Sequence, residues 1–254
     1  MAKRIVVLML SLVLASCTTE PTTTPTLTLA HVVTTPALEG IVTWWCASYA
    51  EELGLSPIEL EILPPNEALA AAESGEVELV ITGVEPPPGW FAVLLEIEGI
   101  AVVVHPSNPL RVFSMEDLAA IFTGEVTSWQ KLGGADKQIQ PVIPLPGDEV
   151  RIRFENLVLG GSPPSPAAQL GPTPLAVSMI VAEDPGAIGY LPFSQVTEEV
   201  RPIRVDGVLP GSSSIQDGRY PLRLEILALA PEKPTGVAYE WLAWLQSSQP
   251  TGNP

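Results

Sequence analysis

The chain has 254 residues, 46% of them hydrophobic, which is enough to bury one or two cores. Its 29 acidic residues outnumber its 12 basic residues, and the net charge of −17 argues against a nucleic-acid partner, which requires a basic face. A supply of only two histidines, with no zinc-binding, phosphate-loop or nucleophile-elbow motif, argues against an enzyme, and we expect neither metal nor cofactor.

The chain begins with the pattern of a secretory signal. Lys3 and Arg4 give a positive start, residues 5–14 are apolar, and small residues precede Cys17. This apolar run is too short for a membrane-spanning helix, which needs about 20 residues. Residues 14–17 read Leu-Ala-Ser-Cys and resemble the lipobox of bacterial lipoproteins, which implies that residues 1–17 are a signal and that Cys17 carries a lipid. The alternative is an ordinary signal peptide with an incidental cysteine.

The segment at residues 18–28 consists mostly of Thr and Pro and predicts an extended tether, because it can bury too little apolar surface to fold. Removal of the signal takes away Lys3 and Arg4 and leaves 10 basic and 29 acidic residues, a net charge of −19. Cys46 then has no partner in the chain, and its apolar, helical surroundings predict a buried thiol rather than a nucleophile.

The first half of the remaining chain alternates between strand and helix patterns. We predict strands at residues 27–33, 58–63 and 77–82, and helices at residues 35–52 and 66–74. Thr35 followed by Pro36 is typical of a helix start, and Gly54 and Gly75 are typical of helix ends. This alternation predicts a parallel sheet covered by helices.

The second half continues the alternation after a proline-rich loop at residues 83–89. We predict strands at residues 100–104, 139–143, 187–191 and 222–230, and helices at residues 114–124, 148–159, 173–183 and 237–246. Ser114 and Asp117 form a capping box, and the double glycine at residues 160–161 ends the predicted helix at residues 148–159. The whole pattern suits two α/β lobes with the chain crossing between them.

Several segments resemble the phosphate-binding proteins of phosphate ABC transporters. Residues 102–109 form a valine-rich strand followed by Asn-Pro, and residues 114–134 form a helix ending Ile-Phe-Thr-Gly, then a Trp before a Gly-Gly. Residues 186–190 are similar to the family's Gly-x-Ile-Gly-Tyr strand, and residues 206–208 and 220–223 resemble its return segment.

This resemblance implies the α/β, two-lobed type II periplasmic-binding-protein fold, with a ligand cleft between the lobes. It divides the chain into lobe 1 at residues 29–103, lobe 2 at residues 104–205, and a return to lobe 1 at residues 206–250. His105 and Asn108 would then flank the hinge, with lining of the cleft or a structural role as alternatives.

The family's site holds phosphate with hydroxyls and helix N-terminal N–H groups, plus an Arg and an Asp, and the corresponding loops here are altered. The first loop keeps only Thr34 and Thr35, and the third has Thr82 with no arginine nearby. The fourth carries Asp148 and Glu149 where a hydroxyl and a glycine would meet the anion. The resemblance assigns these ligand-binding candidates: Thr34, Thr35, Thr82, Asp148, Glu149 and Arg151.

Each candidate also has a structural interpretation. The threonines can cap a helix or close a turn, the two acids can be helix-start carboxylates or contacts for a cation or amine, and the arginine can lie on a solvated helix face. Two carboxylates would repel a dianion and occupy the N–H donors themselves. We therefore expect either phosphate or another small solute. It should occupy a gap of about 300 Å³ between the threonine hydroxyls and the helix start near Asp148. We expect Trp129 in the core, and Trp90 either at the cleft mouth or on a partner.

We therefore predict an extracytoplasmic solute-binding lipoprotein of an ABC-type transporter. It is monomeric, is anchored to the cell membrane through Cys17, and delivers a small solute such as an inorganic anion to the transporter permease. The alternative is a degenerate binding scaffold that acts in protein interaction or sensing at the cell surface. An extracytoplasmic hydrolase, the third possibility, lacks an identifiable nucleophile and base.

Overall fold

The computed structural model describes residues 29–248. The predicted signal, lipobox and tether lie outside these residues, so the structure leaves them as predictions. Within the described part, no helix combines the length and apolarity that a membrane crossing requires.

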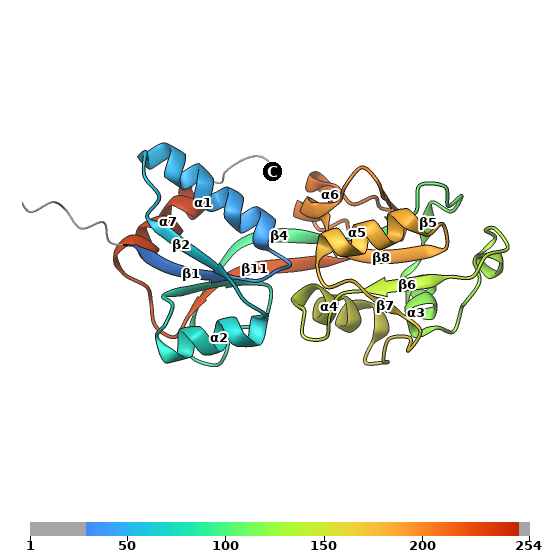
Figure 1. The fold of residues 1–254 in the computed structure, drawn as a ribbon, viewed down its shortest axis with the longest axis horizontal. Coiled ribbons are helices and arrows are strands. Elements are labelled where there is room, and N and C mark those ends of the chain that lie inside the picture. Colours follow the sequence, from blue (N-terminus) through green and yellow to red (C-terminus); the bar gives the residue numbers. More distant parts are fainter. Residues whose placement is uncertain (1–28, 249–254) are drawn as a thin grey trace, which may run out of the picture.

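Two lobes share one curled sheet whose strand order is β2-β1-β3-β11-β4-β8-β6-β7. In the part that we call lobe 1, β1 (Ala30–Thr34) pairs in parallel with β2 (Ile58–Ile62) and β3 (Leu79–Thr82). Helices α1 (Glu39–Leu53) and α7 (Gly236–Ser248) cover one face of this sheet, and α2 (Pro65–Ser74) covers the other (Figure 1). The predicted parallel sheet with covering helices is confirmed.

Local signals in the sequence explain where the lobe 1 helices end. Gly54 and Gly75 take left-handed conformations with φ of 69° and 80°, and such residues stop helices α1 and α2 as predicted. The start of α1 differs from the prediction, because the helix begins at Glu39 and not at Thr35. The Thr35 hydroxyl does not cap α1, whose N-cap position is Leu38, and instead donates to Glu149 Oε1.

Two long antiparallel strands, β4 (Phe91–Val104) and β11 (Arg223–Ala230), connect the lobes (Figure 1). Residues 91–99 of β4 pair with β11, and residues 100–104 pair with β8 (Ala187–Pro192). The predicted strand at residues 100–104 is therefore the second half of a longer strand. The crossing lies within β4, so the prediction that His105 and Asn108 flank the hinge is wrong. Both residues follow the far end of β4, where Asn108 accepts a bond from the Leu110 amide.

The part that we call lobe 2 is built on the second half of β4 and three further strands. Strand β8 is antiparallel to β4 and parallel to β6 (Gln140–Ile143), which pairs with β7 (Gln169–Leu170). A small separate sheet joins β5 (Val112–Phe113) to β10 (Arg204–Val205), and β9 (Arg201–Pro202) pairs with the end of β4. Because β4 pairs with β11 at one end and with β8 at the other, it joins the strands of both lobes into the one sheet.

The helices of lobe 2 begin where their caps predict. Ser114 and Asp117 form the predicted capping box of α3 (Met115–Thr123), and Thr173 caps α5 (Pro174–Glu183) by accepting a bond from the Ala176 amide. Helix α4 (Glu149–Phe154) continues as a single π-helical turn, η2 (Glu155–Leu159), which ends at Gly160. The predicted helix at residues 148–159 is thus confirmed with a wider last turn.

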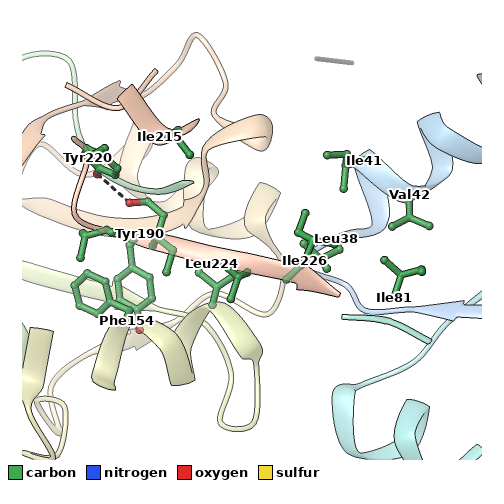
Figure 2. Close-up of a cluster of buried hydrophobic side chains, with 14 of the residues drawn as sticks. Leu38, Ile41, Val42, Ile81, Phe154, Tyr190, Ile215, Tyr220, Leu224 and Ile226 are labelled. Carbon is green, nitrogen blue, oxygen red and sulfur yellow. Dashed lines mark hydrogen bonds between the residues drawn. The ribbon is translucent and has the colours of Figure 1, made fainter. Parts of the chain in front are cut away.

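One continuous apolar cluster runs through both lobes. In lobe 2 the rings of Phe154 and Tyr190 stack with centroids 3.8 Å apart. Leu224 and Ile226 on β11 carry the cluster across the junction toward Leu38, which lies just before α1 (Figure 2). Apolar contact therefore extends across the crossing and supports the arrangement of the lobes.

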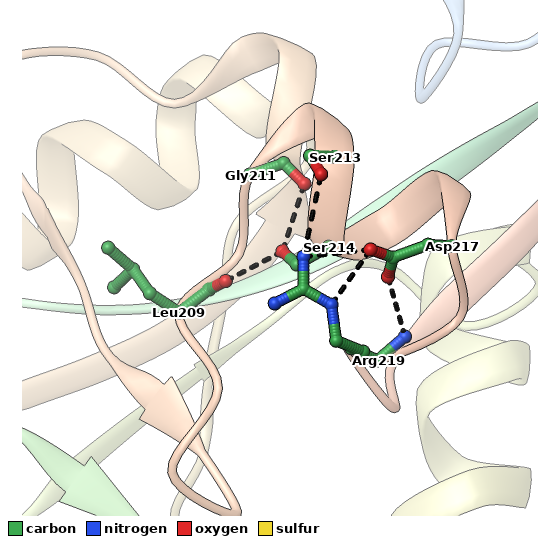
Figure 3. Close-up of polar contacts among 6 residues, drawn as sticks. All are labelled: Leu209, Gly211, Ser213, Ser214, Asp217 and Arg219. Atoms are coloured by element: carbon green, nitrogen blue, oxygen red, sulfur yellow. Dashed lines mark hydrogen bonds and ion pairs between the residues drawn. The ribbon is translucent and has the colours of Figure 1, made fainter.

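The segment between β10 and β11 remains at the junction instead of returning to lobe 1 at residue 206. Its short helix α6 (Ser212–Gln216) contacts β4, and the Ile215 side chain lies directly against Gly99. The Ser214 hydroxyl donates to the carbonyl oxygens of Leu209 and Gly211, and Asp217 pairs with Arg219 beside it (Figure 3). The chain re-enters lobe 1 only along β11.

Candidate functional site

Three hydrogen-bond donors of lobe 1 gather at one edge of its sheet. Thr35 follows β1 directly, Thr82 is the last residue of β3, and Gly83 comes next. Because β1 and β3 are parallel, with Thr34 opposite Ile81, their carboxyl ends meet at the same edge. Both hydroxyls are buried, so this edge presents two O–H groups and one backbone N–H toward lobe 2.

The partner of these donors is Glu149, the first residue of α4 in lobe 2. Thr35 Oγ1 donates to Glu149 Oε1 at 2.5 Å, and Thr82 Oγ1 donates to Oε2 at 2.5 Å. The Gly83 amide also donates to Oε2, at 3.0 Å. Glu149 is only 1% exposed. Its carboxylate therefore bridges the lobes and fills the position where the sequence predicted a gap for a solute.

Thr34 does not take part in this cluster. Its hydroxyl donates to the carbonyl oxygen of Ile81 at 3.1 Å, within the sheet of lobe 1. The structure thus brings together three of the six candidates, Thr35, Thr82 and Glu149, whereas Thr34 bonds within the lobe 1 sheet.

Asp148 occupies the amino end of α4, as the sequence predicted. Its Oδ1 accepts bonds from the amides of Val150 at 2.9 Å and Arg151 at 3.1 Å. These are the N–H groups that a helix start offers to an anion. The carboxylate of Asp148 therefore fills the anion position of the helix with a group of the protein itself.

Arg151 already has partners next to α4. Its Nε lies 2.6 Å from Glu155 Oε1, and its Nη1 donates to the Pro144 carbonyl oxygen at 3.1 Å. The side chain is 13% exposed, so the pair is largely shielded from water. The structure therefore shows an ion pair and not a free anion clamp at this position.

Burial dominates the electrostatics of this site. It raises the pKa of Glu149 from 4.5 to about 7, although the bonds from Thr35, Thr82 and Gly83 act in the opposite direction. The nearby charge of Asp148 raises the pKa of Glu149 further, and burial also raises the pKa of Asp148. Two adjacent carboxyl groups thus lie at the junction, and the positive charge of Arg151 lowers the pKa of Asp148 without outweighing burial.

A second contact between the lobes was not predicted from the sequence. Gln195, in the 3-10 turn η3 (Phe193–Gln195), donates from Nε2 to the Ala37 carbonyl oxygen. Its neighbour Ser194 donates to Glu98 on β4, whose other carboxylate oxygen accepts from the Gly99 amide at 2.7 Å. Glu98 is 6% exposed, and burial raises its pKa. No local pattern in residues 193–195 indicates this contact, because Ala37 lies 158 positions away in the sequence.

A small pocket lies beside Glu149, with a volume of about 210 Å³ including its open mouth. Ala37 borders it from lobe 1, and the starts of α4 and α5 border it from lobe 2 through Asp148, Val150 and Thr173. Its walls are mainly apolar and suit an anion poorly. The donors that could bind an anion are those that contact Glu149.

The remaining candidates have structural roles. Trp129 is buried and donates from its indole N–H to the Gly186 carbonyl oxygen at 3.0 Å. Trp90 packs against the apolar cluster between α2 and the lobe 1 sheet. Cys46 is half-buried against the apolar cluster, less buried than predicted, and burial raises the pKa of its thiol to about 12, which does not suit a nucleophile.

Comparison with known proteins identifies the family. The family model of the PBP superfamily domain matches residues 68–249. The chain belongs to this superfamily.

Individual relatives support the resemblance to phosphate-binding proteins that the sequence motifs indicated. The phosphate-binding protein PstS of Bacillus subtilis is 33% identical over 152 residues, which cover 59% of this chain and about half, 50%, of that relative. A putative phosphate ABC transporter substrate-binding protein from Clostridium perfringens, solved with bound phosphate, has a TM-score of 0.80 at 21% identity, covering 87% of this chain and 93% of that one. The two-lobed fold of the resemblance is thereby confirmed.

The same fold also occurs in proteins of another kind. The regulatory domain of CcmR from Synechocystis, solved with 2-PG, has a TM-score of 0.63 at 13% identity, covering 87% of this chain and 97% of that one. Likeness at this level concerns the fold alone, so function has to be argued from the site.

Proposed function

We propose that this protein is the extracytoplasmic solute-binding component of an ABC-type transporter, attached to the membrane through a lipid on Cys17. Membership of the PBP superfamily and the likeness to phosphate-binding proteins support the solute-binding role. The lipobox-like residues 14–17 and the Thr/Pro-rich segment at residues 18–28 support the anchor and the tether.

The observation that carries this proposal is the donor set of lobe 1. Two hydroxyls and one amide, from Thr35, Thr82 and Gly83, converge on a pair of carboxylate oxygens. The same three donors suit any small oxyanion that presents two oxygens to this edge, and phosphate is one such anion. Closure of the lobes around the anion would then be the event that the transporter recognises.

A free anion has to displace Glu149 and approach Asp148, and both carboxylates oppose it. We therefore predict a phosphate affinity weaker than about 100 μM, or about −5.5 kcal/mol. Isothermal titration calorimetry of the detergent-solubilised full-length protein with phosphate, sulfate and acetate tests this. Sub-micromolar phosphate binding would contradict the predicted weakness and restore an unaltered phosphate-binding function.

A second candidate function is that of a closed scaffold for protein interaction or sensing. Glu149 already satisfies the donors of lobe 1, and Asp148 already satisfies those of α4. If none of these anions binds at any concentration tested, this scaffold function replaces solute transport. Regulatory domains with the same fold show that it also serves outside transport.

A further inference from the structure

Glu149 is held in the manner of a bound ligand. Its two oxygens accept bonds from Thr35 and Thr82, which lie 114 and 67 positions away in the sequence, and from the amide next to Thr82. None of the ion pairs among residues 29–248 involves Glu149. The carboxylate is therefore bound by hydroxyl and amide donors alone, which is the chemistry that proteins use to hold small free oxyanions.

Helix capping does not explain this arrangement. Asp148 already caps α4, with one oxygen on two amides of the first turn. Glu149 is the next residue, and its side chain leaves the helix to reach the opposite lobe. Because the helix start is satisfied without it, the position of Glu149 has to be explained by what it does at the junction.

The neighbouring contacts hold the lobes in the position that this bridge requires. Gln195 of lobe 2 binds the Ala37 carbonyl oxygen of lobe 1, and the apolar cluster passes through Leu38 and Ile226 (Figure 2). These contacts lie just after Thr35 in the chain and hold the lobes together, which reduces the conformational freedom that formation of the bridge would otherwise cost.

We propose that Glu149 is a built-in ligand, whose carboxylate closes lobe 2 onto Thr35, Thr82 and Gly83 without any added solute and whose removal leaves a site for a small free carboxylate such as acetate. The inference rests on the proposed function only in taking this cluster as the solute site. The bridge itself requires no transported solute.

The test uses the full-length protein in detergent and follows hydrogen exchange at the Gly83 amide, which donates directly to Glu149. In the wild-type protein we expect this amide to be protected with no ligand added. Glu149→Ala should accelerate its exchange by about tenfold or more, the effect of losing one hydrogen bond to a charged group. Acetate at concentrations on the order of millimolar to tens of millimolar, as suits so small a ligand, should restore protection in Glu149→Ala and change nothing in the wild type.

The matched control is Glu116→Ala, which removes an exposed carboxylate from the first turn of α3 in the same lobe. It should leave exchange at Gly83 unchanged and show no response to acetate relative to chloride at equal ionic strength. Acetate that fails to restore protection in a folded Glu149→Ala protein would overturn the proposal. So would a Gly83 amide that exchanges freely in the wild type until phosphate is added.

If Glu149→Ala does not fold, Thr35→Val decides the question, because it removes one donor and keeps the side-chain shape. Faster exchange at Gly83 in Thr35→Val supports the built-in ligand, and unchanged exchange refutes it.

The outcome of this test can be distinguished from that of the proposed function. A protected Gly83 with no anion binding by calorimetry removes solute transport and keeps the bridge, whereas tight phosphate binding with a freely exchanging Gly83 does the reverse.

Discussion

The stability of this protein should fall as pH rises through neutrality, and Glu149 should account for a defined part of the change. Burial raises the pKa of Glu149 in the folded protein from 4.5 to about 7. For an acid shifted in this direction, the stabilising effect is complete below the unfolded-state pKa and is lost as pH rises through the folded-state value. The relevant window therefore runs from about pH 4.5 to about pH 7.5.

The size of the effect follows from the two pKa values. A change from 4.5 to about 7 corresponds to about 3 kcal/mol over the whole window, of which about 2 kcal/mol falls between pH 5.5 and pH 8. Burial, followed by the charge of Glu98, raises the pKa of Glu96 to about 7, so this residue adds a contribution of the same sign. Burial raises the pKa of Asp148 and Glu98 in the same direction.

The assay is urea unfolding at pH 5.5 and pH 8, compared between the wild type and Glu149→Gln. The wild type should be more stable at pH 5.5, and the glutamine variant should lose about 2 kcal/mol of that difference. Glu116→Gln, which neutralises an exposed acid in the same lobe, controls for the general effect of removing one charge. Equal pH dependence in the wild type and in Glu149→Gln would refute the reasoning, because it would show that Glu149 does not titrate differently in the folded state.

Three further predictions concern the core, a helix start and the anchor. Phe154→Ala should reduce the free energy of unfolding by about 3–5 kcal/mol in urea, because the ring is fully buried and stacks on Tyr190, and a loss below about 1 kcal/mol would contradict this packing. Thr173→Ala should cost about 1 kcal/mol in the same assay through loss of the α5 cap, and an unchanged midpoint would mean that the cap is dispensable. Cys17→Ser should move the protein from the membrane to the soluble fraction without unfolding it, and continued detergent-sensitive membrane association would count against the lipid anchor.

The sequence predicted most helices and strands because their signals are local. The capping box at Ser114 and Asp117, the cap at Thr173 and the stop at Gly75 each involve residues within one turn of each other. The first half of β4 was missed for the opposite reason. Residues 91–99 are half-exposed over much of their length and form a strand because they pair with β11, more than a hundred positions away.

Contacts between residues far apart in the sequence also decide the roles of single residues in the candidate site. Thr35 before a proline is a reasonable helix cap, and only Glu149, 114 positions away, decides that its hydroxyl leaves the helix start and crosses the junction. Asp148 and Glu149 are adjacent acids, and from the sequence alone either of them could cap the start of α4. Their different roles depend on which side chain faces the opposite lobe, and this is a property of the closed arrangement that local sequence does not contain.

A tethered carboxylate changes what solute binding requires of this fold. In a two-lobed binding protein the solute shifts the lobes toward closure only through its greater affinity for the closed state. Glu149 is attached to lobe 2, so it competes for Thr35 and Thr82 at an effective concentration in the millimolar range or above, as linked groups do. A free anion must exceed this competition before it occupies the same donors. An affinity weaker than about 100 μM is therefore the expected consequence of the Glu149 bridge even where the lobe 1 donors themselves suit phosphate well.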